Sequence, residues 1–160
     1  MPFRCTTCGE EHDELPDIGA DKPDQILGVP ESEYGDRIRL TGDTCISGND
    51  RFIRGVLYIP IHGQAEPFGF GVWVSQSRKN FETYLENFDT PKIGPFFGWL
   101  CTNIGYYSER SLGLKTQVHF RGNGQRPTVV LEPTDHPLSV DQREGIALAK
   151  AWEIVHFYMR

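Results

Sequence analysis

The sequence predicts an α+β domain in which an antiparallel sheet of about five strands is packed by two helices. Three observations lead to this fold class: several segments alternate apolar and polar residues, turn-forming segments separate them, and two segments have a helical apolar period. A length of 160 residues suits one domain with a substantial core. We expect a single domain over residues 1–160, with a metal-binding turn at 1–15, an irregular connector at 16–35 and the α+β core at 36–160.

The first three strands are expected in the segments 37–40, 52–61 and 68–75. The third alternates most clearly, and its other face carries Gly69 and Gly71 beside Trp73. Glycine weakens a strand unless another group approaches it closely. This face therefore predicts either an aromatic ring from a neighbouring strand above the glycines or a ligand groove with a backbone floor.

The later strands are expected at 112–120 and 127–132, joined by a hairpin loop at 121–125 that is rich in glycine. The apolar segment 95–101 is compatible with either a strand or a helix, because its length and composition do not separate the two.

Two helices are expected, one over 77–88 and one that begins near residue 139 and runs toward the C-terminus. Ser77 is a suitable N-cap for the first helix. For the second, Ser139 at the N-cap and Gln142 three residues later match a capping box.

The composition limits the class of partner. A net charge of −6 and a pI near 5.3 argue against general binding to nucleic acid, which requires a basic face. The same charge is compatible with a basic protein partner such as a toxin. The sequence has no apolar run of about 20 residues and no signal-peptide pattern, so we expect a soluble cytoplasmic protein without membrane contact.

The residues Cys5, Cys8, Gly9 and His12 form the most informative motif of the chain. Two thiols at i and i+3, followed by a glycine and an imidazole, are typical of a short turn that binds a tetrahedral metal ion. A redox role for such a cysteine pair would require a strand before it and a helix after it, and the flanks have neither pattern. A thiolate-rich ligand set favours Zn²⁺.

A closed structural zinc site requires four protein ligands. Cys45 is the preferred fourth ligand, because it follows the end of a predicted strand and can fold onto the N-terminus, while Cys101 and His136 are weaker substitutes. With only three protein ligands, a water molecule would take the fourth position and become a nucleophile. A pair of unligated thiols is the remaining interpretation. The predicted metal ligands are Cys5, Cys8, His12 and Cys45.

Glu132, Asp135 and His136 form the best candidate for acid–base chemistry, because a histidine beside two carboxylates can act as a general base. The structural alternative is a turn that leads into the last helix, in which Pro137 holds His136 in an extended conformation.

No local motif indicates a catalytic nucleophile. A triad of Cys101, His119 and Asp135 lacks the strand–nucleophile–helix arrangement that such sites require. The glycines of the 121–125 hairpin do not precede a helix, so they form no phosphate loop or dinucleotide fingerprint. No catalytic residue is therefore assigned.

Three segments carry a resemblance to a known family: Phe3–His12, Gly71–Ser75 with Pro95–Leu100 behind it, and Leu131–Leu138. The chain resembles the bacterial domain-of-unknown-function family 2199 over nearly its whole length. The resemblance implies a bacterial, single-domain, soluble protein whose family pattern includes the N-terminal cysteine pair, residues 43–45 and residues 135–137. It implies no activity.

These observations predict a non-catalytic binding protein with a structural Zn²⁺ site. Its most concrete form is an immunity protein that neutralises a basic toxin by protein–protein binding. One alternative is a zinc-dependent hydrolase, with Glu132 or His136 as base beside a metal held by Cys5, Cys8 and His12. The other is a small-molecule-binding domain built around Gly69, Gly71, Trp73 and Trp99.

Overall fold

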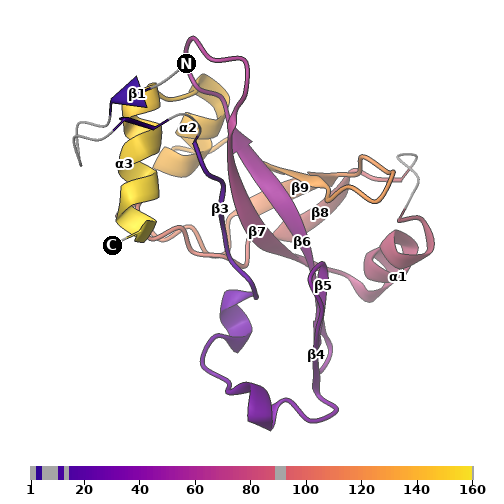
Figure 1. The fold of residues 1–160 in the computed structure, drawn as a ribbon. Helices are drawn as coiled ribbons and strands as arrows, with labels where there is room; N and C mark the ends of the chain where they lie inside the picture. The colour runs from indigo at the N-terminus through magenta and orange to yellow at the C-terminus, as the bar shows by residue number, and fades with distance from the viewer. Residues whose placement is uncertain (1–2, 5–10, 13–14, 89–92, 160) are drawn as a thin grey trace.

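The computed structural model describes residues 3–4, 11–12, 15–88 and 93–159. It confirms the α+β class, because a strongly bent sheet is covered by helices (Figure 1). The sheet has eight strands where about five were predicted, and the described residues form three helices where two were predicted. A separate small sheet pairs β1 (Phe3–Arg4) with β2 (Glu11–His12).

The centre of the sheet is the antiparallel pair of β6 (Asp50–Ile59) and β7 (Phe68–Gln76), as predicted from their alternation. Their register runs from Arg51 opposite Gln76 to Ile59 opposite Phe68, with residues 60–67 as the connecting loop. The even-numbered residues of β7 and the odd-numbered residues of β6 from 53 to 59 share one face of the sheet, so this pair separates two buried regions.

The sheet is mixed, which corrects the prediction of an antiparallel one. Its order is β3–β7–β6–β10–β9–β8, and β4 joins through β5 to β6. The strands β3 and β10 run parallel to their neighbours β7 and β6. The strands β3 and β5 were not predicted, and the segment of β8 was left as either strand or helix. These strands have only two to four residues, which is too short for an alternating pattern to be recognised. The remaining bounds are β3 Ile18–Gly19, β4 Ile38–Leu40, β5 Thr44–Ser47, β8 Phe96–Trp99, β9 Lys115–His119 and β10 Thr128–Leu131.

The last strand in this order, β8, returns to β7, so the sheet curls toward a barrel. Leu100 forms a bridge with Val74, and the backbone N–H of Cys101 donates to the carbonyl of Trp73 at 2.7 Å. Gly98 permits this approach, since a Cβ at this position would lie 2.5 Å from the carbonyl oxygen of Ser75. A side chain at residue 98 would therefore force the two strands apart.

The first helix follows the prediction. The helix α1 (Arg78–Glu86) begins after Ser77, whose side-chain oxygen accepts a hydrogen bond from the backbone N–H of Asn80 at 3.1 Å. This is the expected N-cap geometry.

The second predicted helix is two helices, α2 (Pro137–Glu144) and α3 (Leu148–Met159), and its predicted cap is wrong. His136, not Ser139, is the N-cap, with Pro137 in the first turn. Gly145 ends α2 with a φ of 81°, a conformation that other residues rarely adopt. Gln142 instead binds the sheet, donating to the carbonyl of Val129 and accepting from the N–H of Leu131.

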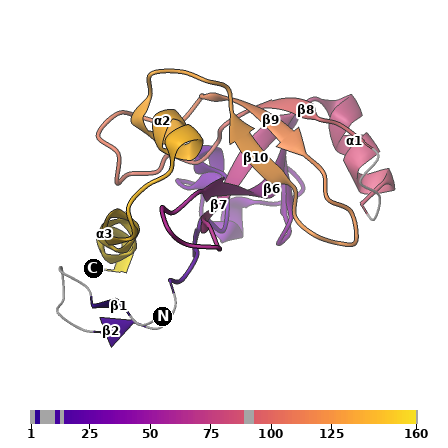
Figure 2. The same ribbon diagram turned by 90° about the horizontal axis from the view of Figure 1, so that it is seen from above.

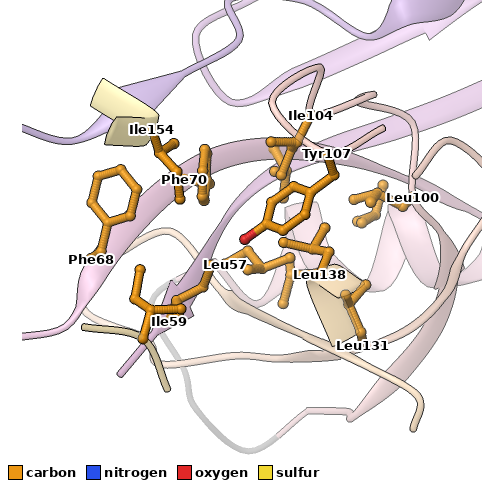
Figure 3. Close-up of a cluster of buried hydrophobic side chains, with 14 of the residues drawn as sticks. Leu57, Ile59, Phe68, Phe70, Leu100, Ile104, Tyr107, Leu131, Leu138 and Ile154 are labelled. Carbon is orange, nitrogen blue, oxygen red and sulfur yellow. The ribbon is translucent and has the colours of Figure 1, made fainter. Parts of the chain in front are cut away.

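The larger of two buried clusters lies on the face of β6 and β7 that the helices cover (Figure 3). Leu57, Phe70, Leu138 and Ile154 are among the fully or nearly fully buried side chains there. We call this cluster the main core.

A second cluster, the small core, lies on the opposite face, because its members from β6 and β7 are one residue out of phase with the main core. Its buried residues are Ile26, Ile38, Cys45, Phe52, Trp73 and Cys101.

Candidate functional site

Only part of the predicted zinc site falls within the described residues. Cys5 and Cys8 lie outside them, and only the backbone of His12 is described, in β2. In Figures 1 and 2, β1 and β2 lie on the side of the molecule that α3 occupies, whereas β5, which carries Cys45, lies at the far side of the sheet. Within the described residues no group of three or more histidine, cysteine or acidic side chains is placed to hold a metal. The ligand set stays a prediction.

The two described cysteines, Cys45 and Cys101, are free thiols in the small core. Burial raises the pKa of each thiol to about 11. The Cys101 Sγ also donates to the carbonyl of Trp99 at 3.3 Å. Because the nucleophile is the thiolate, neither cysteine is reactive near neutral pH. The geometry therefore gives no support to the triad, whose other two members, His119 and Asp135, are exposed on β9 and in the turn before α2.

The acid–base candidate around His136 has a structural role in this fold. Nδ1 of His136 accepts a hydrogen bond from the N–H of Leu138 at 3.0 Å, which leaves Nε2 protonated and donating to the carbonyl of Glu109 at 3.1 Å. Both ring nitrogens are thus used by the backbone, and the side chain is buried. Glu132 accepts from Gln117, while Asp135 is exposed. His136 therefore supports the turn and the cap of α2, and its imidazole has no free ring nitrogen to act as a base.

An arginine covers Gly71 on the glycine face of β7, an outcome that neither sequence interpretation included, while Gly69 faces Asp17 and Val56. The register puts Arg54 opposite Trp73, and the guanidinium lies across Gly71 and Gly19, where added Cβ atoms would lie 3.6 and 3.3 Å from its Nη2. A Cβ at Gly71 would also lie only 3.1 Å from the Cα of Gly19, so β3 and β7 approach closely here. Trp73 is fully buried and donates through Nε1 to the carbonyl of Ala20.

Arg54 is a partly buried cation, with 15% of its side chain exposed. Among the described residues its nearest carboxylate, on the exposed Asp21, is 3.7 Å away, and its Nε has no hydrogen-bond partner. Burial, followed by the nearby Arg126, lowers the pKa of Arg54. The residue holds the segment around β3 against the sheet. Only the strand register, not the local sequence, places it over the glycines.

The region from residue 16 to residue 51 forms a projecting lobe, visible in Figure 1 as the segment that carries β3, both short 3₁₀ turns and the β4–β5 hairpin. We call it the acidic lobe. It contains eight acidic and four basic residues, so it carries a net charge of −4 out of the −6 of the whole chain. Six of its acidic side chains are exposed: Asp17, Asp21, Glu31, Glu33, Asp36 and Asp50.

The acidic lobe is firmly attached to the sheet. Ile26, Ile38 and Cys45 of the lobe are buried in the small core. The backbone N–H of Asp24 donates to the carbonyl of Cys101, and the Asp24 carboxylate accepts from the N–H of Asn103 at 2.9 Å. Its charges are therefore held on a defined surface.

Trp99, the remaining residue of the small-molecule hypothesis, lies on β8 beside β7, and 47% of it is exposed to solvent. Its ring packs edge-on against Phe97, with 5.1 Å between the ring centroids. Trp99 therefore lies one strand away from Trp73, but the pocket that Trp99 lines does not include the buried Trp73 ring.

In the part of the chain that the structure describes, no helix is both long enough and apolar enough to cross a membrane. Residues 4–146 match the profile of a family described as "Uncharacterized protein conserved in bacteria (DUF2199)", in agreement with the resemblance drawn from the motifs. Neither the curated proteins nor the solved structures contain a significant match.

Proposed function

The chain belongs to the bacterial family DUF2199, and we propose that it is a non-catalytic binding protein that docks onto a basic partner protein through its acidic lobe. The observation that carries the proposal is the concentration of negative charge on a lobe that is fixed to the sheet by its own buried cluster. In its most concrete form, the protein is an immunity protein and the partner is a basic toxin.

Electrostatic physics supports this role. Opposite potentials speed the encounter of two proteins and suppress binding to wrong partners. A surface that is already ordered loses little conformational freedom on binding, so more of the interaction energy contributes to affinity. The acidic lobe has both properties, since its exposed carboxylates stand on backbone that is tied to residues 101–103.

The chemistry of the described side chains favours binding over the hydrolase alternative. The His136 imidazole is occupied by two backbone hydrogen bonds, and the buried thiols of Cys45 and Cys101 have raised pKa values. A zinc-dependent hydrolase with His136 as base would have to break the hydrogen bond that caps α2.

The docking proposal is tested by a triple variant, Glu31→Gln/Glu33→Gln/Asp36→Asn, and the basic proteins encoded beside this gene as partners. Association should slow about tenfold at low ionic strength, and the difference should shrink as salt is added. The matched control Glu66→Gln/Glu86→Gln/Asp135→Asn changes the net charge equally at exposed positions outside the lobe. Equal effects of the two triple variants, or no binding of any basic neighbour, would overturn the proposal.

We propose further that the N-terminal turn holds a structural Zn²⁺ through Cys5, Cys8 and His12, the part of the predicted ligand set that lies on the turn itself. Metal analysis of protein purified without added metal should give one zinc per chain, and Cys5→Ser or Cys8→Ser should abolish it. Unfolding by a chelator would support a structural site. Absence of zinc would rule out the proposed metal site. If the chelated protein stays folded but loses a hydrolytic activity, the hydrolase alternative is favoured.

A further inference from the structure

A pocket of about 260 Å³ lies where the acidic lobe meets the rest of the molecule. Three parts of the chain surround it: the segment from β3 to the first 3₁₀ turn, the loop that follows Cys101 and the last turn of α3. The volume is just below the range of about 300–1,000 Å³ that is usual for small-molecule sites, so a ligand of this pocket is small. Its apolar lining residues are Ile18, Leu27, Phe70, Ile104 and Tyr158.

The apolar wall of the pocket is continuous with the main core. Phe70 and Ile104 are both buried in that core (Figure 3). The Tyr158 ring packs edge-on against Phe70, with 6.4 Å between the ring centroids. Leu27 also lines the pocket, although 60% of it is exposed to solvent. A ligand with an apolar part would gain contacts with a wall that is already ordered, and it would cover part of Leu27.

Asp24 gives the pocket a fixed carboxylate. Its Oδ2 accepts a hydrogen bond from the backbone N–H of Asn103 at 2.9 Å, and both residues line the pocket. The other oxygen, Oδ1, has no hydrogen-bond partner among the described residues and is not buried. Burial raises the pKa of Tyr158, and the charge of Asp24 adds to this effect, so the carboxylate acts on the aromatic side of the pocket. One acceptor oxygen is therefore available to a ligand.

Lys22 is the one basic residue of the lining. It is half-buried and makes no ion pair with any other described residue. Asp21 lines the pocket too, but its carboxylate is 93% exposed and lies 3.7 Å from the guanidinium of Arg54. A partly buried ammonium group without a counter-charge favours a ligand that supplies a carboxylate.

The pocket thus combines a cation, an available carboxylate oxygen and an apolar wall. A ligand with a single charge would match one of the two charged side chains and be repelled by the other. A zwitterion matches both. We propose that this pocket binds a free α-amino acid with an apolar side chain. The amino acid's carboxylate binds Lys22, its ammonium group donates to Asp24, and its side chain packs against Phe70 and Tyr158.

The test uses the full chain and three probes: leucine, methionine and phenylalanine. At least one should shift the amide resonances of Lys22, Asp24 and Asn103 in an NMR titration. For the tightest probe, the analogue that lacks the carboxylate and the analogue that lacks the amino group should each bind at least tenfold more weakly. For phenylalanine these analogues are phenethylamine and 3-phenylpropanoate.

Two charge variants address the two ends of the ligand. Lys22→Gln and Asp24→Asn should each weaken amino-acid binding about tenfold, because each removes one charge. An asparagine at position 24 can still accept from the N–H of Asn103, so this variant keeps the contact between the lobe and the loop. The matched controls Lys79→Gln and Glu86→Gln remove the same charges at exposed positions on α1 and should leave the affinity unchanged.

A third variant addresses the apolar wall. Leu27→Ala should weaken binding about fivefold, whereas Leu85→Ala, which truncates an exposed leucine outside the pocket, should not change it. Binding of none of the three probes overturns the proposal, as do shifts that map elsewhere or an analogue with one charge that binds as tightly as the amino acid. No basic partner is present in these measurements, so their outcome is independent of the docking proposal.

Discussion

The two buried clusters of this molecule lie on opposite faces of β6 and β7, and they differ in what they join. The main core takes side chains from all three helices and most strands of the large sheet, so it holds the whole fold together. The small core has six buried residues, of which half come from the acidic lobe. The acidic lobe is therefore attached to the rest of the molecule mainly through the small core. We expect the lobe to unfold locally while the strands packed in the main core stay folded.

The largest effect is expected in the main core. Leu57→Ala removes a fully buried side chain from the central strand and should lower the free energy of unfolding by about 3 kcal/mol, because the cavity cannot collapse. Urea denaturation followed by far-UV circular dichroism and by tryptophan fluorescence should show one shifted, coincident transition. Val130→Ala, at an exposed position on β10, is the control and should change stability by less than about 0.5 kcal/mol. Separate transitions for the two signals would contradict the assignment of Leu57 to the shared core.

A smaller and local effect is expected in the small core. Ile26→Ala removes a buried side chain from the lobe and should cost about 2 kcal/mol of local stability. Native-state hydrogen exchange should then show faster exchange for the amides of β4 and β5, with little change for β9 and β10. If protection falls equally in all four strands, the lobe is not a separate opening unit.

The third difference between the two cores is their sensitivity to alkaline pH. Burial raises the pKa of Cys45 and Cys101 from 9.0 to about 11, so above pH 9 the unfolded chain loses these protons while the folded chain retains them. The folded state then binds more protons, and stability must fall as the pH rises from about 9 to 11. In the main core, burial raises the pKa of Tyr84 and Tyr107 above 10.0. The stability that depends on these tyrosines therefore begins to fall only above about pH 10.

Unfolding measured in urea at intervals from pH 8 to pH 11 checks this order. The double variant Cys45→Ala/Cys101→Ala should flatten the decline between pH 9 and 10 and leave the later, tyrosine-dependent decline in place. An unchanged slope between pH 9 and 10 would show that the small-core thiols do not carry the early loss.

The fold class and the longest elements were predictable because local patterns specify them. The alternation of residues 68–75 and the cap at Ser77 were confirmed. Short strands such as β3 and β5 carry too few residues for a pattern, and the parallel contacts of β3 and β10 depend on where other strands lie. The break between α2 and α3 did have a signal, Gly145, which the continuous apolar stripe outweighed.

The candidate sites were less predictable, because they depend on register. The turn interpretation of Asp135 and His136 followed from Pro137 and is supported by the hydrogen bonds of His136. In contrast, Arg54 covers Gly71 only through the pairing of β6 with β7. The pocket between Lys22 and Tyr158 likewise joins segments that lie far apart in the chain, so no local pattern encodes it.

The contact of β8 with β7 also affects the tendency of the protein to aggregate at high concentration. A strand with two exposed aromatic rings is normally a hazard, because its free backbone edge can recruit another chain into a growing sheet. Here the backbone carbonyl of Phe97 accepts a hydrogen bond from the Gln76 side chain, and the backbone N–H of Trp99 donates to the Ser75 side chain. At the other end of the strand order, β3 offers only two residues for pairing. The contact of β8 with β7 at Gly98 thus leaves Phe97 and Trp99 exposed to solvent while it blocks the edge of β8 to a strand from another chain.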